Sequence, residues 1–187
     1  MKFDRLTSLP PTIDLGDYRL RTLRSEDAPA WYGYLSDIET IQLTSYDVSS
    51  VDTVQQYIAH YLSGYEQRSS SRWAIADAVS DQLIGTCGYY WWNPQDSLAE
   101  LSYDLSKDYW GKGIMSQAVK AVLRWGFDVL EINRIQATVM VGNNTSARIL
   151  EKCGFQKEGL LREYKFCRGE LKDFWLFAHL RREYGAD

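Results

Sequence analysis

The sequence predicts an α+β fold: a mixed, mainly antiparallel sheet covered by helices on both faces, in a three-layer arrangement. Segments in which polar and apolar residues alternate, the pattern of half-buried strands, occur near both ends of the chain and in its middle. Apolar residues at helical spacing mark four further segments. At 187 residues, with no internal repeat or linker, the chain is expected to form one domain over residues 1–187.

The first half of the chain is expected to contain one strand, two helices and three further strands. Residues 17–23 alternate like a strand, and Ser25-Glu-Asp is typical of the capped, acidic start of a helix that runs to about Tyr34. A helical repeat from Ser50 to Leu62 is closed by Ser63-Gly64. Turn residues then separate three strands of an antiparallel meander, at 72–77, 82–92 and 98–105.

The second half is expected to contain two helices and three strands. A helix follows Gly113 and leads into a strand at 135–141. A further helix runs from Asn143 to Lys152 and is ended by Gly154. The last two strands, at 160–166 and 171–180, are joined by Arg168-Gly169-Glu170, in which glycine supplies the unusual dihedral of a hairpin turn.

Composition and charge exclude several classes of protein. With 45% hydrophobic, 25% charged and 14% aromatic residues, the chain matches an ordinary soluble globular protein. A formal net charge of −4 disfavours a nucleic-acid partner, which would favour a basic stripe. Neither residues 1–11 nor any later stretch has the apolar run of a signal peptide or a membrane span, so we expect a cytoplasmic protein without a membrane partner.

The cysteines support neither a disulfide framework nor a metal site. Cys87, Cys153 and Cys167 form no C-x-x-C pair, and only His60 and His179 are available as companions. We therefore expect no metal. Cys87 lies in an apolar strand and Cys153 between a helix and a strand, which favours buried, inert thiols at both positions.

The segment from Leu105 to Met115 carries the clearest chemical signal. A predicted strand ends there in a turn that opens directly into a helix. Backbone N–H groups at a helix start, with the helix dipole behind them, bind phosphate, and Gly111 and Gly113 let the backbone approach an anion closely. The segment matches neither a Walker phosphate loop nor a dinucleotide fingerprint. On these residues alone, an anion site and a merely tight strand-to-helix turn stay equally open.

Asp108-Tyr-Trp-Gly-Lys-Gly113 resembles the coenzyme A-binding motif of the Gcn5-related N-acetyltransferase (GNAT) family, Gln/Arg-x-x-Gly-x-Gly/Ala. It matches at both glycines and departs at Asp108. The Y-W-G-K-G form is similar to that of the RimJ/RimL branch, the ribosomal-protein alanine acetyltransferases. The resemblance covers about residues 15–185 and includes the segments Ala99–Leu105, Asn143–Ser146, Ile149–Phe155 and Glu158–Arg162.

The resemblance implies the GNAT fold, in which residues 98–105 and 135–141 form a central parallel strand pair that splays apart. Acetyl-coenzyme A, the acetyl-donor substrate, would enter the opening between these strands. Backbone groups of the first strand and of the turn would bind it, with Lys112 adding charge. The residues assigned to its binding in this way are Tyr103, Asp104, Leu105, Trp110, Gly111, Lys112, Gly113, Ile114 and Asn143.

The resemblance also suggests which groups move protons. Glu100 matches the glutamate of the branch motif E-[IL]-[GS]-Y and is the first candidate for the general base. Glu158 is the second, although it could equally pair with Arg162. Many family members use a tyrosine before Gly-Phe as the acid for the departing thiolate, but that position is Leu150 here. Ser146 is the substitute candidate, with a structural hydroxyl or an unassisted thiolate as the alternatives.

The implied activity is transfer of an acetyl group to a primary amine by direct attack in a ternary complex. The leading hypothesis for the acceptor is the N-terminal α-amino group of a protein. The alternatives are a small-molecule amine, such as a polyamine or an aminoglycoside, and a non-catalytic acyl-coenzyme A sensor. Trp31, Trp92 and Tyr164 are expected in the wall of the acceptor site, and the protein is expected to be a monomer or a homodimer.

Overall fold

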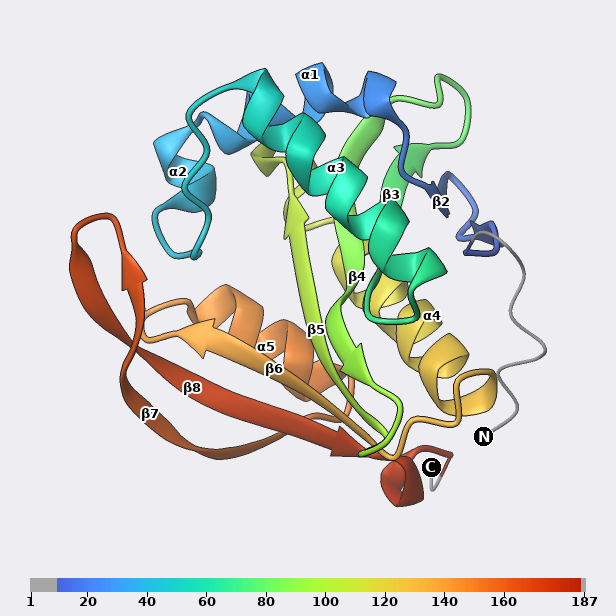
Figure 1. The fold of residues 1–187 in the computed structure, drawn as a ribbon, viewed down its shortest axis with the longest axis vertical. Helices are drawn as coiled ribbons and strands as arrows, with labels where there is room; N and C mark the ends of the chain where they lie inside the picture. The colour runs from blue at the N-terminus through green and yellow to red at the C-terminus, as the bar shows by residue number, and fades with distance from the viewer. Residues whose placement is uncertain (1–9, 186–187) are drawn as a thin grey trace.

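The computed structural model describes residues 10–185, which form an eight-stranded sheet between two layers of helices (Figure 1). The sheet order is β1-β2-β3-β4-β5-β6-β8-β7, and β5–β6 is its one parallel pair within these residues. The strands are β1 (Ile13–Asp14), β2 (Tyr18–Thr22), β3 (Ser71–Asp77), β4 (Leu83–Asn93), β5 (Leu98–Leu105), β6 (Arg134–Met140), β7 (Gln156–Cys167) and β8 (Glu170–Leu180).

Helices cover both faces of the sheet, as the sequence predicts. In Figure 1, α3 passes in front of the strands, and α4 and α5 lie behind them. The α-helices are α1 (Ala28–Leu35), α2 (Ile38–Ile41), α3 (Val51–Glu66), α4 (Ile114–Asp128) and α5 (Asn144–Lys152), and short 3-10 helices occur at Ser25–Asp27, Lys107–Tyr109 and Arg181–Glu183. None of the helices within residues 10–185 is long and apolar enough to span a membrane. Residues 1–9, in which the sequence shows no signal-peptide pattern, lie outside the described residues.

Most predicted elements are confirmed, with three corrections. The helix expected to close at Ser63-Gly64 continues to Glu66, because Gly64 lies inside it and accepts the close approach of the following loop. A Cβ at Gly64 would lie 1.9 Å from the Ser70 hydroxyl oxygen. The strand β1 and the helix α2 were not expected, since elements of two and four residues are too short to show a period.

The parallel pair at the centre of the sheet separates early. Strands β5 and β6 are paired only at Leu98–Arg134, Ala99–Ile135 and Glu100–Gln136. Beyond Glu100, β5 keeps its pairing with β4 and β6 keeps its pairing with β8, so the two strands diverge while each stays in the sheet (Figure 1). The splayed pair implied by the resemblance is therefore present, and its opening faces the C-terminal ends of both strands.

Two hydrophobic clusters flank the sheet and account for most of the large aromatic side chains. Trp31 belongs to α1 and is fully buried in the cluster that includes residues of α3, and Trp92 packs with Tyr65 and Trp125 in the other cluster. The expectation that Trp31 and Trp92 form walls of an acceptor site is therefore wrong, because both belong to the core. Cys87 and Cys153 are buried as predicted, and Cys167 is buried as well.

A buried ion pair fixes the C-terminal end of β5 to β3. The Arg72 guanidinium contacts the Asp104 carboxylate at 2.6 Å, and both side chains are almost fully buried. Asp104 also accepts hydrogen bonds from Tyr34, Tyr46 and Thr86. Because these partners satisfy the carboxylate, the pair is tolerated in the interior. The Asp104 side chain thus serves the fold, and only its backbone is left for the predicted role toward acetyl-coenzyme A.

Asp104→Asn should lower the free energy of unfolding by about 3–5 kcal/mol, because it leaves the Arg72 charge buried without an anion. The matched control is Glu158→Gln, which breaks the exposed pair with Arg134 and should cost less than about 1 kcal/mol. Guanidinium denaturation of both variants measures the difference. Equal losses would show that the Arg72–Asp104 pair contributes no more than a surface contact.

Candidate active site

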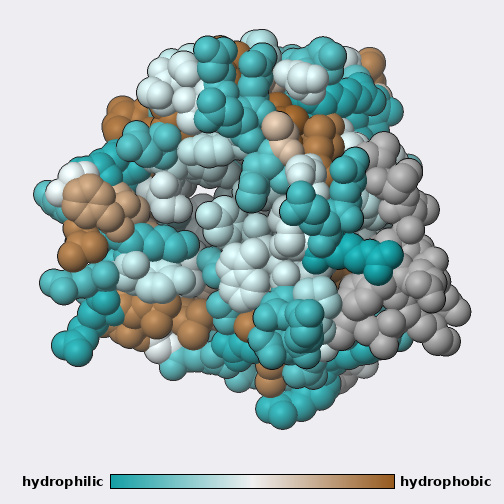
Figure 2. All heavy atoms as spheres, viewed as in Figure 1, coloured by the Kyte–Doolittle hydropathy of each residue, from teal (hydrophilic) through white to brown (hydrophobic). Residues whose placement is uncertain are grey.

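A cavity of about 740 Å³ lies where β5 and β6 diverge. It is bounded by the residues that join α2 to α3, by α3, by the divergent strands, by the start of α5 and by the β7–β8 hairpin. Figure 2 shows the hollow in this face, rimmed mainly by residues of intermediate hydropathy. The cavity is therefore built at the point that the separation of the strands leaves open.

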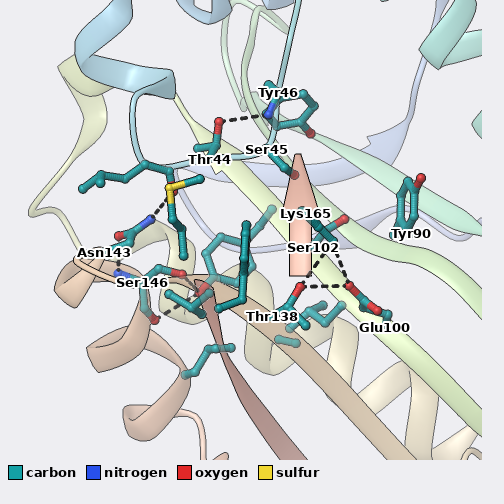
Figure 3. A pocket seen from close by; sticks show the side chains of 18 of the residues that line it. Thr44, Ser45, Tyr46, Tyr90, Glu100, Ser102, Thr138, Asn143, Ser146 and Lys165 are labelled. Atoms are coloured by element: carbon teal, nitrogen blue, oxygen red, sulfur yellow. Dashed lines mark hydrogen bonds and ion pairs between the residues drawn. The ribbon is translucent and has the colours of Figure 1, made fainter. Parts of the chain in front are cut away.

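Glu100 lies on the cavity wall, at the last position where β5 pairs with β6. Its carboxylate accepts hydrogen bonds from Trp91 Nε1 and Thr138 Oγ1, both at 3.1 Å, and Lys165 Nζ lies 3.6 Å away. Figure 3 shows Glu100, Thr138 and Lys165 together on one side of the cavity, across from Asn143 and Ser146. Glu100 is only 5% exposed, so these partners hold its carboxylate in one place beside the cavity.

A β-bulge in β4 brings Trp91 to Glu100. The pairing of β4 with β5 shifts between Tyr89 and Trp91, so Tyr90 has no partner residue on β5. Tyr89 is buried against α4, Tyr90 lines the cavity, and Trp91 reaches Glu100. The four consecutive aromatic residues of β4 are thereby divided between core and site.

The cavity carries little net charge. Among the described residues that line it, Glu100 and Lys165 are the only charged side chains if His60 is counted as neutral, and they contact each other. Most other polar lining groups are hydroxyls, and five belong to Tyr46, Tyr57, Tyr61, Tyr90 and Tyr103. Burial raises the pKa of Tyr46 and Tyr61 above the ordinary value, so both phenols remain neutral hydrogen-bonding groups.

The opposite side of the cavity is formed by the other face of β5 and by α5. Tyr103 points to this side and shares a hydrogen bond of 2.8 Å with the hydroxyl of Ser146. Burial raises the pKa of the Tyr103 phenol well above its usual range, so it keeps its proton. The side chain of Asn143 accepts a hydrogen bond from the Ser146 N–H and caps α5. Asn143, Ser146 and Tyr103 thus form one connected group.

The 42–46 loop, which joins α2 to α3, closes the cavity on its remaining side. Arg168, in the turn of the β7–β8 hairpin, donates to the carbonyl oxygens of Gln42, Thr44 and Tyr46 at distances between 2.7 and 3.1 Å. The Asn143 amide donates to the Leu43 carbonyl oxygen at 3.1 Å. The loop is therefore tied both to the hairpin and to the start of α5.

The glycine turn before α4 has the backbone conformation that the sequence predicts. Gly111 and Gly113 have φ angles of +76° and +77°, and Gly113 is the N-cap of the helix. Trp110 stabilises the turn by donating from Nε1 to the Leu105 carbonyl at 2.9 Å, and Lys112 lies over the Tyr109 ring. Ile114 is buried in the core and anchors the start of α4. The free N–H groups of this helix start offer an anion site, and no acidic residue occupies its first turn.

Two further predicted residues lie away from the cavity lining. Glu158 forms a two-point ion pair with Arg134, at 2.6 and 2.9 Å, and not with Arg162 as the sequence suggested. The hydrogen bond from Arg134 lowers the pKa of Glu158, which makes it a poor proton acceptor. Tyr164 packs edge-on against Phe174, and of these two it is Phe174 that lines the cavity. The structure therefore favours Glu100 over Glu158 as the base.

The residues that sequence reasoning missed are Trp91, Thr138 and Lys165, which surround Glu100. They come from three other strands, and no local motif marks any of them.

A metal role has no support within residues 10–185, where no group of three His, Cys, Asp or Glu side chains could hold an ion.

Comparison with known proteins identifies the family of this chain. The family model of the acetyltransferase (GNAT) domain matches residues 18–156. An uncharacterised N-acetyltransferase, p20 of Bacillus licheniformis, is 38% identical over 172 residues, which cover 89% of this chain and 94% of the relative. The chain therefore belongs to the GNAT acetyltransferases and is an N-acetyltransferase.

Solved structures of this family share the fold. The ribosomal-protein-S5-alanine acetyltransferase of Vibrio fischeri superposes with a TM-score of 0.81 at 23% identity, covering 94% of this chain and 99% of that one. RimL, a ribosomal α-N-protein acetyltransferase solved in complex with coenzyme A, gives a TM-score of 0.82 at 19% identity, covering 91% and 98%. At these identities the likeness establishes the fold, and the acceptor has to be argued from the cavity.

Gly113→Asp should weaken the binding of acetyl-coenzyme A by at least about tenfold, because it places a negative charge beside the helix start. Gly113→Asn is the matched control, since asparagine tolerates this conformation and carries no charge. Isothermal titration with coenzyme A measures both. Unchanged affinity in the aspartate variant would remove the turn from the donor site.

Proposed function

We propose that this enzyme transfers the acetyl group of acetyl-coenzyme A to the N-terminal α-amino group of a protein. The observation that carries the proposal is the charge balance of the cavity: its one carboxylate, Glu100, already has a lysine partner. A cavity of this kind suits an acceptor with a single amine.

Polycationic acceptors fit this cavity poorly. A polyamine or an aminoglycoside carries several ammonium groups, and each needs a carboxylate or other strong acceptor to replace its water. Lys165 adds a positive charge where such a molecule would have to bind. A peptide N-terminus brings one ammonium and a short run of amide groups, which the cavity hydroxyls of Tyr57 and Tyr90 can satisfy.

Glu100 is positioned to deprotonate the acceptor. An α-amino group has a pKa of about 7.7–8.0, compared with about 10.4 for a lysine side chain, so a modest base at neutral pH is sufficient. The hydrogen bonds from Trp91 and Thr138 occupy one site on each carboxylate oxygen and leave further lone pairs for the ammonium. After losing its proton to Glu100, the amine attacks the thioester directly.

The donor side is supplied by residues on the other face of β5. Acetyl-coenzyme A would bring the activated acetyl group, with its pyrophosphate at the helix start of Gly113 and its arm between the diverging strands. Unpaired backbone groups of β5 between Tyr103 and Leu105 border that opening. The Tyr103 and Ser146 hydroxyls offer hydrogen bonds to the departing sulfur. Because burial keeps Tyr103 protonated, its role is to donate a hydrogen bond.

A panel of acceptors tests the proposal. Free thiol release from acetyl-coenzyme A should be at least about tenfold faster with peptides that have free N-termini than with spermidine or an aminoglycoside. N-terminally blocked peptides that contain lysine are the control, and mass spectrometry identifies the acetylated nitrogen. Turnover confined to the small polyamines would overturn the assignment of the acceptor.

Glu100→Gln tests the base through its pH dependence. The variant should lose about 100-fold in kcat/KM near pH 6.5, where the α-amine is protonated, and less than about tenfold near pH 9, where it is neutral. Glu158→Gln is the matched control and should follow the wild-type profile, because Glu158 lies outside the cavity lining. A profile of the Glu100 variant that stays parallel to the wild type would argue against Glu100 as the base.

A further inference from the structure

Lys165 places a primary amine inside the cavity of an enzyme that acetylates primary amines. Its Nζ lies 3.6 Å from the Glu100 carboxylate and 3.3 Å from Thr138 Oγ1. Among the described residues that line the cavity, it is the one with an amino group. We propose that Lys165 is a self-acetylation site of this enzyme, an inference that rests on the proposed location of the acetyl group.

The position of Lys165 is that of an acceptor. Glu100 and Thr138 stand on either side of the point where β5 and β6 separate, and Lys165 reaches over them from β7 (Figure 3). An acetyl group carried between the strands emerges at this point. The Lys165 amine therefore lies beside the base, next to the place that an incoming α-amine takes.

The surroundings hold the lysine there without burying it. Its Nζ lies 5.2 Å from the Tyr164 ring centroid and 5.5 Å from that of Phe174, and these rings attract the ammonium. The side chain remains 31% exposed, and its flexible stem lets the amine move by several bond rotations. Proximity of this kind raises the local amine concentration far above that of any surface lysine.

The reaction balances with groups already present. The Lys165 ammonium gives one proton to Glu100, and the neutral amine forms a C–N bond with the acetyl carbon. The thioester C–S bond breaks, the sulfur leaves as the thiol of coenzyme A, and one proton passes to solvent in total. A bound acceptor competes with Lys165 for Glu100, so this reaction is confined to periods without acceptor.

Acetylation would change the cavity in two ways. The amide nitrogen carries no charge, so the ion pair with Glu100 is lost. The added acetyl group also fills space in which the acceptor binds. Incubation with acetyl-coenzyme A in the absence of an acceptor would then lower the acetyltransferase activity of the enzyme. The loss would be complete after one acetylation per chain.

The test is incubation of the full-length protein with acetyl-coenzyme A alone, followed by intact mass measurement and peptide mapping. We expect one acetyl group per chain at Lys165, formed at least about tenfold faster than at Lys172. Lys172 is the matched comparison, because it is the register partner of Lys165 on β8 and lies outside the cavity lining. The rate per chain should not depend on protein concentration, and Gly113→Asp should reduce it.

The variants Lys165→Arg and Lys172→Arg show whether the loss of activity depends on Lys165. Prior incubation with acetyl-coenzyme A should reduce peptide acetylation by the wild type and by Lys172→Arg, but should leave the activity of Lys165→Arg constant in time. Acetylation of both lysines at equal rates, or no modification of Lys165 while peptides are acetylated, would overturn the inference and leave the proposed function intact. Absence of all acetyl transfer, to peptides and to Lys165, would overturn both.

Discussion

The early separation of β5 from β6 is the constraint on which the rest of the site depends. Three paired positions hold the strands together, and beyond Glu100 each strand keeps only its outer neighbour. A continuous sheet would leave no passage from one helical layer to the other. Glu100 is the last residue of β5 that pairs with β6. Because the strands separate beyond it, its buried carboxylate lies at the edge of the cavity.

The two-residue period of β5 assigns the sides of the cavity. Glu100, Ser102 and Asp104 face α3, while Tyr103 faces α5 and Leu101 enters the adjoining core. The proposed base and the proposed donor site therefore lie on opposite faces of one strand. The Arg72–Asp104 pair fixes this strand from the side of α3, so the rotation of β5 that would exchange the two faces is opposed by a buried charge.

The sequence predicts those features that neighbouring residues encode. Alternation gives β5 with its correct bounds, and the positive φ angles of the glycine turn follow from the need for Gly111 and Gly113 before α4. Features made by distant residues were not predictable in this way. Lys165 and Glu100 are 65 positions apart and meet only because the β7–β8 hairpin brings β7 to the cavity. The spacing of Trp31 favours a core position without excluding the cavity wall, and the structure buries it. Glu100 stays a predicted base, and the contacts of its carboxylate could not be predicted from neighbouring residues.

The walls of the cavity differ in how firmly they are built into the protein. Ala137, Val139 and Leu150 on the donor side are core residues, whereas the acceptor side uses partly exposed positions such as Tyr57 and Tyr90. Replacing a core residue costs stability, and replacing a partly exposed one costs little. Descendants of one ancestral enzyme can therefore exchange acceptors by surface substitutions while retaining the same acetyl donor.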